Sequence, residues 1–246
     1  AQIHEVCLQL GIQTFNQNQY AEAFTHFSKA LAGAEPTKVP NIHFYMAETL
    51  FRDKKYLEAG KYYENVLTAS ASFDLIDKAK YSLAWCRIKS GSPENAVALF
   101  QTLAENASSV NRKEAFRNLI DLLMNLHRYQ EAATWMAKAP GVLSADEATE
   151  MEYLRGLALS RLGEYPDAIK SFQAFVRGHP KHPRAEDAHY QLGMIKISLG
   201  KYQEALNELS PILRRETAPE IREKALYRVG ECYFNLGNMK NAKETF

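Results

Sequence analysis

The chain has 246 residues, of which 46% are hydrophobic and 24% charged, and its formal net charge at pH 7 is +1. This near-neutral charge argues against an overall electrostatic attraction to nucleic acid or to an anionic membrane surface. The hydrophobic residues suffice for a continuous core, and no uninterrupted apolar run approaches the ~20 residues of a transmembrane helix.

One alanine recurs along the chain at steps of 36 or 37 residues. Its seven copies are Ala23, Ala59, Ala96, Ala132, Ala168, Ala205 and Ala242. A fixed period of this length is typical of one supersecondary unit stacked on copies of itself. Each unit then buries its apolar face against its neighbours, so the period predicts a repeat array with an extended surface.

Other residue types keep the same period around the alanine. Four residues after it stands a large apolar residue: Phe27, Tyr63, Phe100, Met136, Phe172, Leu209 and Phe246. Twelve residues before it stands a small residue in six of the seven copies: Gly11, Ala47, Ala84, Gly156, Gly193 and Gly230, with Ile120 as the exception. Residues three or four apart share one helix face. The pattern therefore predicts two helices per unit that approach closely at the small residues.

Residues that end and start helices separate the two helices of a unit. Glycine follows the expected first helix at Gly91, Gly163, Gly200 and Gly237, where a left-handed backbone is favourable. Proline marks most junctions between units: Pro36, Pro40, Pro140, Pro180, Pro183, Pro211 and Pro219. The predicted unit is thus helix, short turn, helix and junction, and no strand pattern is present.

This pattern resembles the tetratricopeptide repeat, most clearly over residues 153–172 and 190–209. The resemblance covers essentially the whole chain and implies an all-α, right-handed superhelical solenoid of tandem helix-turn-helix repeats. We expect a single array over residues 1–246. Its repeats are expected at approximately 4–37, 40–73, 77–110, 113–146, 149–182, 186–219 and 223–246, the last one incomplete.

Two features bear on the compartment and point in different directions. The junction at residues 178–193 resembles those of bacterial cell-envelope members of the family, such as the barrel-assembly lipoprotein and the Tol–Pal-associated periplasmic proteins, and favours the periplasm or envelope. Cys7, Cys86 and Cys232 lie in predicted first helices too far apart to form disulfides, and free thiols favour the alternative, the cytoplasm. Because the chain starts without methionine and stops inside a helix, we expect it to be a fragment of a longer protein.

No motif in the sequence indicates catalysis. His179, His182 and His189 are the only clustered residues of a metal-binding type, and no cysteine is spaced to complete a zinc site. A glycine-rich phosphate loop, a nucleophile elbow and an HExxH pattern are all absent from the sequence. We therefore expect a protein that is not an enzyme and holds no metal or cofactor.

The resemblance implies that the first helices line a concave groove. Residues fifteen before each alanine form one ladder, and residues eleven before it lie one turn further along the same face. From these columns we predict a partner-binding surface made of Phe44, Tyr81, Trp85, Tyr153, Leu157, Tyr190, Met194 and Tyr227. The alternative is that the aromatic residues pack between neighbouring first helices. Trp85, Leu157 and Met194 fit this alternative less well, because exposed apolar patches mark binding sites.

The charges on this face predict the class of partner. With the column one turn earlier, the face holds seven acids (Glu5, Glu48, Glu114, Asp121, Glu150, Asp187 and Glu231) and three bases (Lys78, Arg117 and Lys224). A groove about four charges negative predicts a protein or peptide partner that is apolar with neutral or basic flanks, and no nucleic acid. Some family members hold a partner's C-terminal carboxylate with a lysine in the ladder and an asparagine four residues on, and no repeat here has that pair.

The predicted function is a non-catalytic protein–protein interaction scaffold that binds a partner segment in its concave groove, with bacterial envelope assembly as the suggested setting. We expect no direct membrane insertion by these residues. The alternative is an accessory or sensory region of a larger protein that has a catalytic or membrane domain outside this chain. A catalytic motif or a transmembrane segment in the longer sequence would favour the alternative.

Overall fold

The computed structural model describes every residue of the chain except 1, 70–74, 215–218 and 246. The described residues form fourteen α-helices and one 3-10 helix, and they include no strand. The predicted all-α helical repeat fold is therefore confirmed. Contacts between Cα atoms divide the chain into two compact units, residues 1–126 and 127–246.

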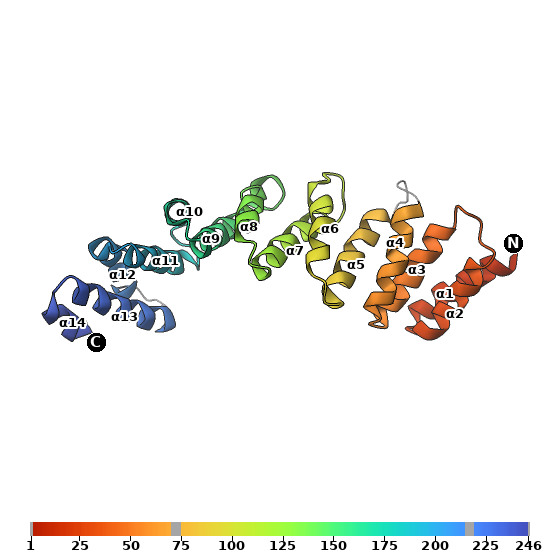
Figure 1. The fold of residues 1–246 in the computed structure, drawn as a ribbon, viewed down its shortest axis with the longest axis horizontal. Coiled ribbons are helices and arrows are strands. Elements are labelled where there is room, and N and C mark those ends of the chain that lie inside the picture. Colours follow the sequence, from red (N-terminus) through yellow and green to blue (C-terminus); the bar gives the residue numbers. More distant parts are fainter. Residues whose placement is uncertain (1, 70–74, 215–218, 246) are drawn as a thin grey trace. The chain divides into compact units, whose positions relative to one another are not determined.

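The first unit contains helices that follow one another in antiparallel pairs (Figure 1). They are α1 (Gln2–Asn16), α2 (Tyr20–Leu31), α3 (Val39–Arg52), α4 (Tyr56–Ala69), α5 (Ile76–Lys89), α6 (Glu94–Glu105) and α7 (Arg112–Asn125). From α1 to α7, each helix packs against the next one along the chain, and α1 also touches α3. The odd-numbered helices of this unit are the predicted first helices of each repeat.

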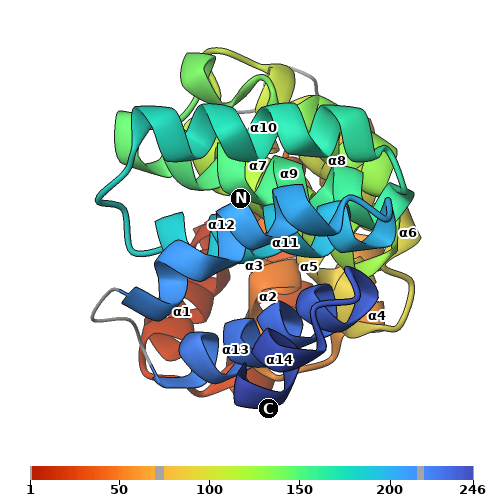
Figure 2. The same ribbon diagram turned by 90° about the vertical axis from the view of Figure 1, so that its left-hand side faces the viewer.

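The second unit repeats this arrangement, and Figure 2 shows its helices stacked in chain order from α9 and α10 to α13 and α14. Its elements are α8 (Tyr129–Met136), the 3-10 helix η1 (Ala139–Gly141), α9 (Ala145–Leu162), α10 (Tyr165–Gly178), α11 (Ala185–Ser198), α12 (Tyr202–Arg214), α13 (Pro219–Asn235) and α14 (Met239–Thr245). Helix α11 touches both α9 and α13, so the first helices of these repeats are neighbours.

The recurring alanine lies in the core of every repeat. It is 0% exposed in six copies and 4% exposed at Ala242. The large apolar residues four positions later are buried as well, and Phe246 lies outside the described residues. A Cβ atom added to Gly156 would lie 2.7 Å from the ring of Phe172, and one on Gly193 would lie 2.5 Å from Leu209. The small residues therefore make room for the large apolar side chain of the second helix.

A left-handed backbone follows the first helix in all seven repeats. The residues with positive φ are Asn18 (62°), Lys54 (62°), Gly91 (85°), His127 (58°), Gly163 (84°), Gly200 (72°) and Gly237 (74°). Each of them precedes the core alanine by five residues. The four glycines were expected from the sequence, whereas the other three copies fold the same way without a glycine.

One expectation about the junctions is wrong. Pro211 does not mark a junction but lies inside α12, which continues to Arg214. A proline within a helix removes one backbone hydrogen bond and crowds the preceding turn. Ile212 is 1% exposed and packs in the core of the second unit, so its burial holds the last turn of α12 in place.

The three cysteines are free thiols, as predicted. Burial, together with the nearby Glu48 carboxylate, raises the pKa of the Cys86 thiol to about 12. Burial and the charge of Glu231 raise the pKa of Cys232 to about 11. Both groups are therefore protonated and poorly nucleophilic at neutral pH.

None of the helices in the described part of the chain has the length and hydrophobicity that crossing a bilayer requires.

Candidate binding grooves

The first unit has an open groove between α3, α5 and the start of α7, which we call the Trp85 groove. It has a volume of about 510 Å³ and is lined by Glu48, Phe51, Arg52, Lys78, Tyr81, Ser82, Trp85, Lys89 and Asn111. Tyr81 and Trp85 stand one turn apart on α5 and share a face, because residues at positions i and i+4 of a helix are neighbours. Two of the predicted binding residues are thus brought together here.

Packing against a buried aromatic ring holds the Tyr81 and Trp85 side chains in place. Both rings meet the buried Phe100 edge to face, with centroid distances of 5.7 Å for Tyr81 and 6.2 Å for Trp85. The Tyr81 hydroxyl accepts a hydrogen bond of 2.8 Å from the Nδ2 amide of Asn118. Both side chains keep part of their surface open to solvent. The groove therefore presents rigid aromatic surface, which loses little conformational entropy when a partner binds.

Glu48, the acid that lines the groove, is buried and hydrogen-bonded to neighbouring side chains. Glu48 is 9% exposed. Its Oε1 accepts hydrogen bonds from the Tyr63 hydroxyl at 2.7 Å and from the Ser82 hydroxyl at 3.2 Å. Burial, and then the Glu48 charge, raise the pKa of Tyr63 well above its ordinary value, so the phenol stays a donor. Glu48 thus joins α3 to α4 and α5, and its Oε1 is already engaged by these two hydrogen bonds.

Three bases form the rim of the Trp85 groove. Arg52, Lys78 and Lys89 are all exposed. The Lys89 ammonium lies 5.8 Å from the centroid of Trp85, and the Lys78 ammonium lies 5.2 Å from that of Phe44. Within the described residues, none of the three bases forms an ion pair. The rim therefore carries uncompensated positive charge.

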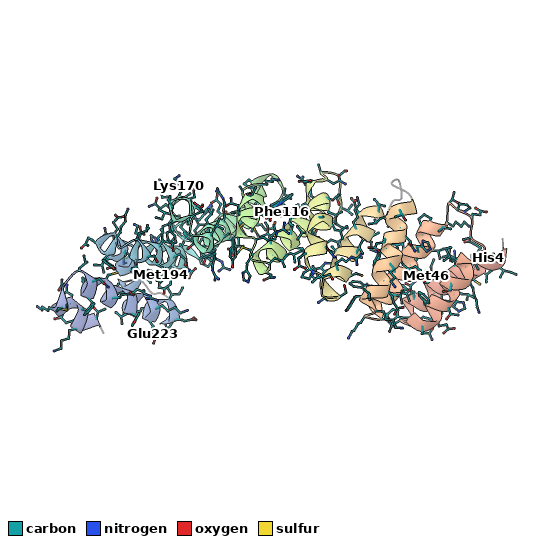
Figure 3. All side chains as sticks on the ribbon, viewed as in Figure 1. His4, Met46, Phe116, Lys170, Met194 and Glu223 are labelled. Carbon is teal, nitrogen blue, oxygen red and sulfur yellow. The ribbon has the colours of Figure 1, made fainter. Side chains whose placement is uncertain are left out.

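The second unit has a shallower surface between α11 and α13, which we call the Tyr227 pocket. It has a volume of about 440 Å³ and is lined by Tyr190, Glu220, Glu223, Lys224, Tyr227 and Arg228. Tyr227 is 58% exposed. Lys224 pairs with Glu220 at 2.7 Å, which leaves Glu223, labelled in Figure 3, as an acid beside the tyrosines. Tyr190 and Tyr227 are thus two further predicted residues that meet in one place.

Two predicted binding residues lie in the core instead. Phe44 and Tyr153 are each 2% exposed. The Tyr153 ring packs 5.8 Å from Phe172 and 5.6 Å from Phe175, and its hydroxyl donates to Asp187. These two side chains follow the alternative, packing between neighbouring helices. Burial, with the Asp187 hydrogen bond, raises the pKa of Tyr153 above its ordinary value.

The last two predicted residues are accessible but line neither surface. Leu157 on α9 and Met194 on α11 are partly exposed, and neither lines the Trp85 groove or the Tyr227 pocket. Figure 3 shows Met194 on α11 in the second unit. Their role in binding remains a prediction.

The acidic columns are less negative than their sequence count, because bases outside the columns pair with them. Lys38 lies 2.6 Å from Glu5 and lowers the pKa of that carboxyl group. Arg184 pairs with Glu150, and Arg228 lies 2.8 Å from Glu231. The predicted negative charge therefore does not extend along the whole face, and at the Trp85 groove the sign is reversed.

Sequence reasoning missed Phe51, Arg52 and Lys89 at this groove. Arg52 and Lys89 each precede the core alanine of their repeat by seven residues, one turn beyond the column that holds Trp85. The periodicity therefore contained the signal, and extending the face by one turn would have found both bases.

His179 and His182 both pack against the ring of Phe175, whereas His189 lies beside Glu208. His179 lies 3.3 Å from the Thr149 hydroxyl, and His182 packs on Phe175. His189 contacts Glu208 at 2.8 Å, and Lys196 contacts the same carboxylate at 2.7 Å. Burial raises the pKa of Glu208, but these two hydrogen bonds outweigh it and the net shift is downward. In the part of the chain that the structure describes, no three His, Cys, Asp or Glu side chains are grouped to hold a metal ion.

Comparison with known sequences places this pattern among described families. A family model described as a tetratricopeptide repeat matches residues 81–148 and 153–209. A second model with the same description matches residues 224–246. Among proteins with curated descriptions, none matches this sequence.

Solved structures share the fold at low sequence identity. A tetratricopeptide repeat protein from Parabacteroides merdae is 15% identical with a TM-score of 0.55, covering 100% of this chain and 90% of its own. YrrB, described as a TPR protein with an unusual peptide-binding site, is 21% identical with a TM-score of 0.53 over 81% of this chain and 96% of its own. The Naa15/Naa10 complex bound to HypK-THB is 12% identical with a TM-score of 0.72, covering 98% of this chain and 36% of that one.

Proposed function

Because the chain belongs to the tetratricopeptide repeat family, we propose that it is a non-catalytic scaffold that binds a segment of another protein at the Trp85 groove. The family's fold supports protein–protein interaction in general. The observation that carries the specific proposal is the pair Tyr81 and Trp85, which are partly exposed and held rigid on Phe100. Tryptophan and tyrosine in such positions dominate binding energy at protein interfaces.

A peptide is the form of partner that this groove suits. YrrB is described as having an unusual peptide-binding site, and that protein shares the helical repeat fold. A volume of about 510 Å³ accommodates a few side chains of an extended segment. The adjacent bases and the Asn111 amide supply polar contacts that would fix its orientation.

The Tyr227 pocket is proposed as a second contact surface, with a different preference. Lys224 and Arg228 are each paired with a glutamate, so Glu223 leaves a small negative charge beside the exposed Tyr227 ring. This surface suits an apolar segment with neutral or basic flanks. The accessible Leu157 and Met194 would extend the apolar contact in this unit.

The biological setting that we propose is bacterial envelope assembly. It rests on the junction at residues 178–193, whose Pro180 and Pro183 follow the form seen in envelope members of the family. The other possibility is an accessory or sensory region attached to a catalytic or membrane domain elsewhere in a longer protein. Cellular fractionation of the full-length protein distinguishes an envelope location from a cytoplasmic one.

The scaffold proposal is tested by removing the two aromatic side chains. We expect Tyr81→Ala with Trp85→Ala to abolish capture of the partners that the wild-type protein retains, because truncating each hot-spot residue costs about 2 kcal/mol or more of binding free energy. Affinity capture from the source cells followed by mass spectrometry is the measurement. The matched control is Leu57→Ala, a 63% exposed apolar residue on α4 of the same unit.

The choice of residues matters for this test. Tyr153 stands in the ladder too, but its burial means that Tyr153→Ala would unfold the core rather than probe a groove. Circular dichroism should show the same helical content for the double variant, the control and the wild type. Capture of the same partners at the same level by the double variant would place the binding surface elsewhere.

A further inference from the structure

We propose that the Trp85 groove selects a protein segment in which an apolar or aromatic side chain is flanked by acidic side chains. This inference rests on the proposed function of the groove and adds the chemistry of its partner. It runs opposite to the preference predicted from the acidic columns, because the charges that line this groove differ from the average of those columns.

The charge balance of the lining carries the inference. Arg52, Lys78 and Lys89 contribute three positive charges, and Glu48 contributes one negative charge, which gives a net charge of +2. The Glu48 carboxylate is buried and already accepts two hydrogen bonds. The three bases are exposed and form no ion pair among the described residues. Carboxylates of a partner would therefore find cations that no carboxylate of the described residues already pairs with.

The three bases surround the aromatic surface of Tyr81 and Trp85 and do not all lie on one side of it. Lys78 stands in the first turn of α5 and Lys89 in its last turn, so Tyr81 and Trp85 lie between them along one helix. Arg52 ends α3 and lines the same groove. An extended segment lying along α5 would place one side chain on the rings and its flanking residues near the bases.

Donors in the groove favour the same class of ligand. The Tyr81 hydroxyl accepts from Asn118, which leaves its own hydrogen available for an acceptor. The Nδ2 amide of Asn111 is buried and has no hydrogen-bond partner among the described residues. Rotation of this side chain on binding would satisfy it with a carboxylate or a backbone carbonyl. Unpaired donors are costly, and a ligand acceptor removes that cost.

Single-stranded nucleic acid is the other anionic ligand that stacks on aromatic rings. Strong binding of that kind uses a basic groove that follows several successive phosphates. Here the bases number three, and the whole chain has a net charge of +1. An acidic peptide needs only two or three such contacts, so the structure favours a peptide.

The experiment uses three matched peptide libraries, each acetylated and amidated at its ends so that no terminal carboxylate contributes. Each peptide has a central Phe, Trp, Leu or Met, and its flanks are drawn from Glu and Asp, from Gln and Asn, or from Lys and Arg. Binding of each peptide to the purified chain is measured by calorimetry. We expect the best acidic peptides to bind about tenfold or more tightly than their amide counterparts.

Charge-reversed protein tests whether these bases are responsible. Lys78→Glu with Lys89→Glu should weaken the acidic peptides about tenfold or more, because like charges then meet across the interface. The helix dipole effects of the two changes oppose one another, since one is at each end of α5. The matched control, Lys29→Glu with Lys61→Glu, makes the same charge change at exposed positions on α2 and α4 and should bind as the wild type does.

The outcomes separate this inference from the proposed function. Acidic and amide peptides that bind equally well, and that both lose affinity with Trp85→Ala, would overturn the inference and leave the scaffold proposal standing. Selection of basic flanks, or tighter binding of a thymidine oligonucleotide than of any acidic peptide, would also overturn it. Failure of every library to bind in a Trp85-dependent way would overturn both proposals.

Discussion

At the scale of single residues, the contact between a glycine and a large apolar side chain sets how closely two helices approach. Gly156 on α9 faces the ring of Phe172 on α10, and an added Cβ would lie 2.7–2.9 Å from three ring atoms. Phe172 is fully buried and packs against Tyr153, so its ring cannot move aside freely. The absence of a side chain at residue 156 is therefore a packing requirement.

This requirement predicts opposite results for two helical glycines. We expect Gly156→Ala to lower the free energy of unfolding by about 1–3 kcal/mol through overpacking. Gly60→Ala on α4 should instead raise it by about 0.5–1 kcal/mol, because alanine is the better helix former. A Cβ on Gly60 would meet Leu83 at an ordinary distance of 3.6 Å. Urea unfolding of both variants checks this, and equal effects of the two would contradict it.

Burial at this scale follows from the sequence better than charge does. The alanine and the large apolar residue are spaced by a helical turn, so their faces are fixed by the period alone. Lys38 pairs with Glu5, and Arg184 pairs with Glu150. Each of these two bases stands at the end of a junction, immediately before a helix. The path of a junction depends on its own turns and not on the period. The net charge of a groove therefore cannot be predicted from the period alone.

At the scale of helices, the turn between the paired helices is one backbone conformation used seven times. Four repeats place a glycine at the left-handed position, and the others place Asn18, Lys54 and His127 there. Asparagine tolerates this conformation well, whereas lysine has no local side-chain interaction that favours it. The sequence could not indicate Lys54, because tertiary packing of the two helices imposes the turn.

Strain at Lys54 makes it a site for stabilisation. We expect Lys54→Gly to raise the free energy of unfolding by on the order of 1 kcal/mol. The substitution removes the cost of a left-handed conformation for an L-residue, and the greater flexibility of glycine in the unfolded chain offsets part of that gain. Gly91→Ala should lower it by about 1–2 kcal/mol at the equivalent position. Nothing lies within 4 Å of a Cβ on Gly91, so that cost reflects the backbone alone. Thermal unfolding measures both, and a lower melting temperature for Lys54→Gly would refute the argument.

At the scale of the molecule, the two compact units predict unfolding in parts. In a repeat array each repeat contacts only its neighbours, so stability is a sum of local terms. We expect Phe100→Ala to cost about 3–5 kcal/mol and to unfold the first unit at lower urea than the second. Phe172→Ala should reverse the order, because both rings are 0% exposed and occupy the same repeat position in different units.

Hydrogen exchange measured by mass spectrometry distinguishes the outcomes. In Phe100→Ala, peptides from α5 and α6 should exchange faster while those from α10 to α12 keep their protection. Uniform acceleration along the chain in either variant would show that the array unfolds as one cooperative body.

The hydrogen bonds of Glu48 limit how this array can evolve by recombination. Its two donors, Tyr63 and Ser82, stand on α4 and α5, so one carboxylate ties a repeat to its own second helix and to the following repeat. At the position equivalent to Tyr63, all six of the other repeats carry a residue without a hydroxyl group. Exchanging α4 for another second helix would leave the buried carboxylate short of a donor, at a cost of several kcal/mol. We therefore expect helices α3 to α5 to be exchangeable only as a block, even though the period suggests freely exchangeable repeats.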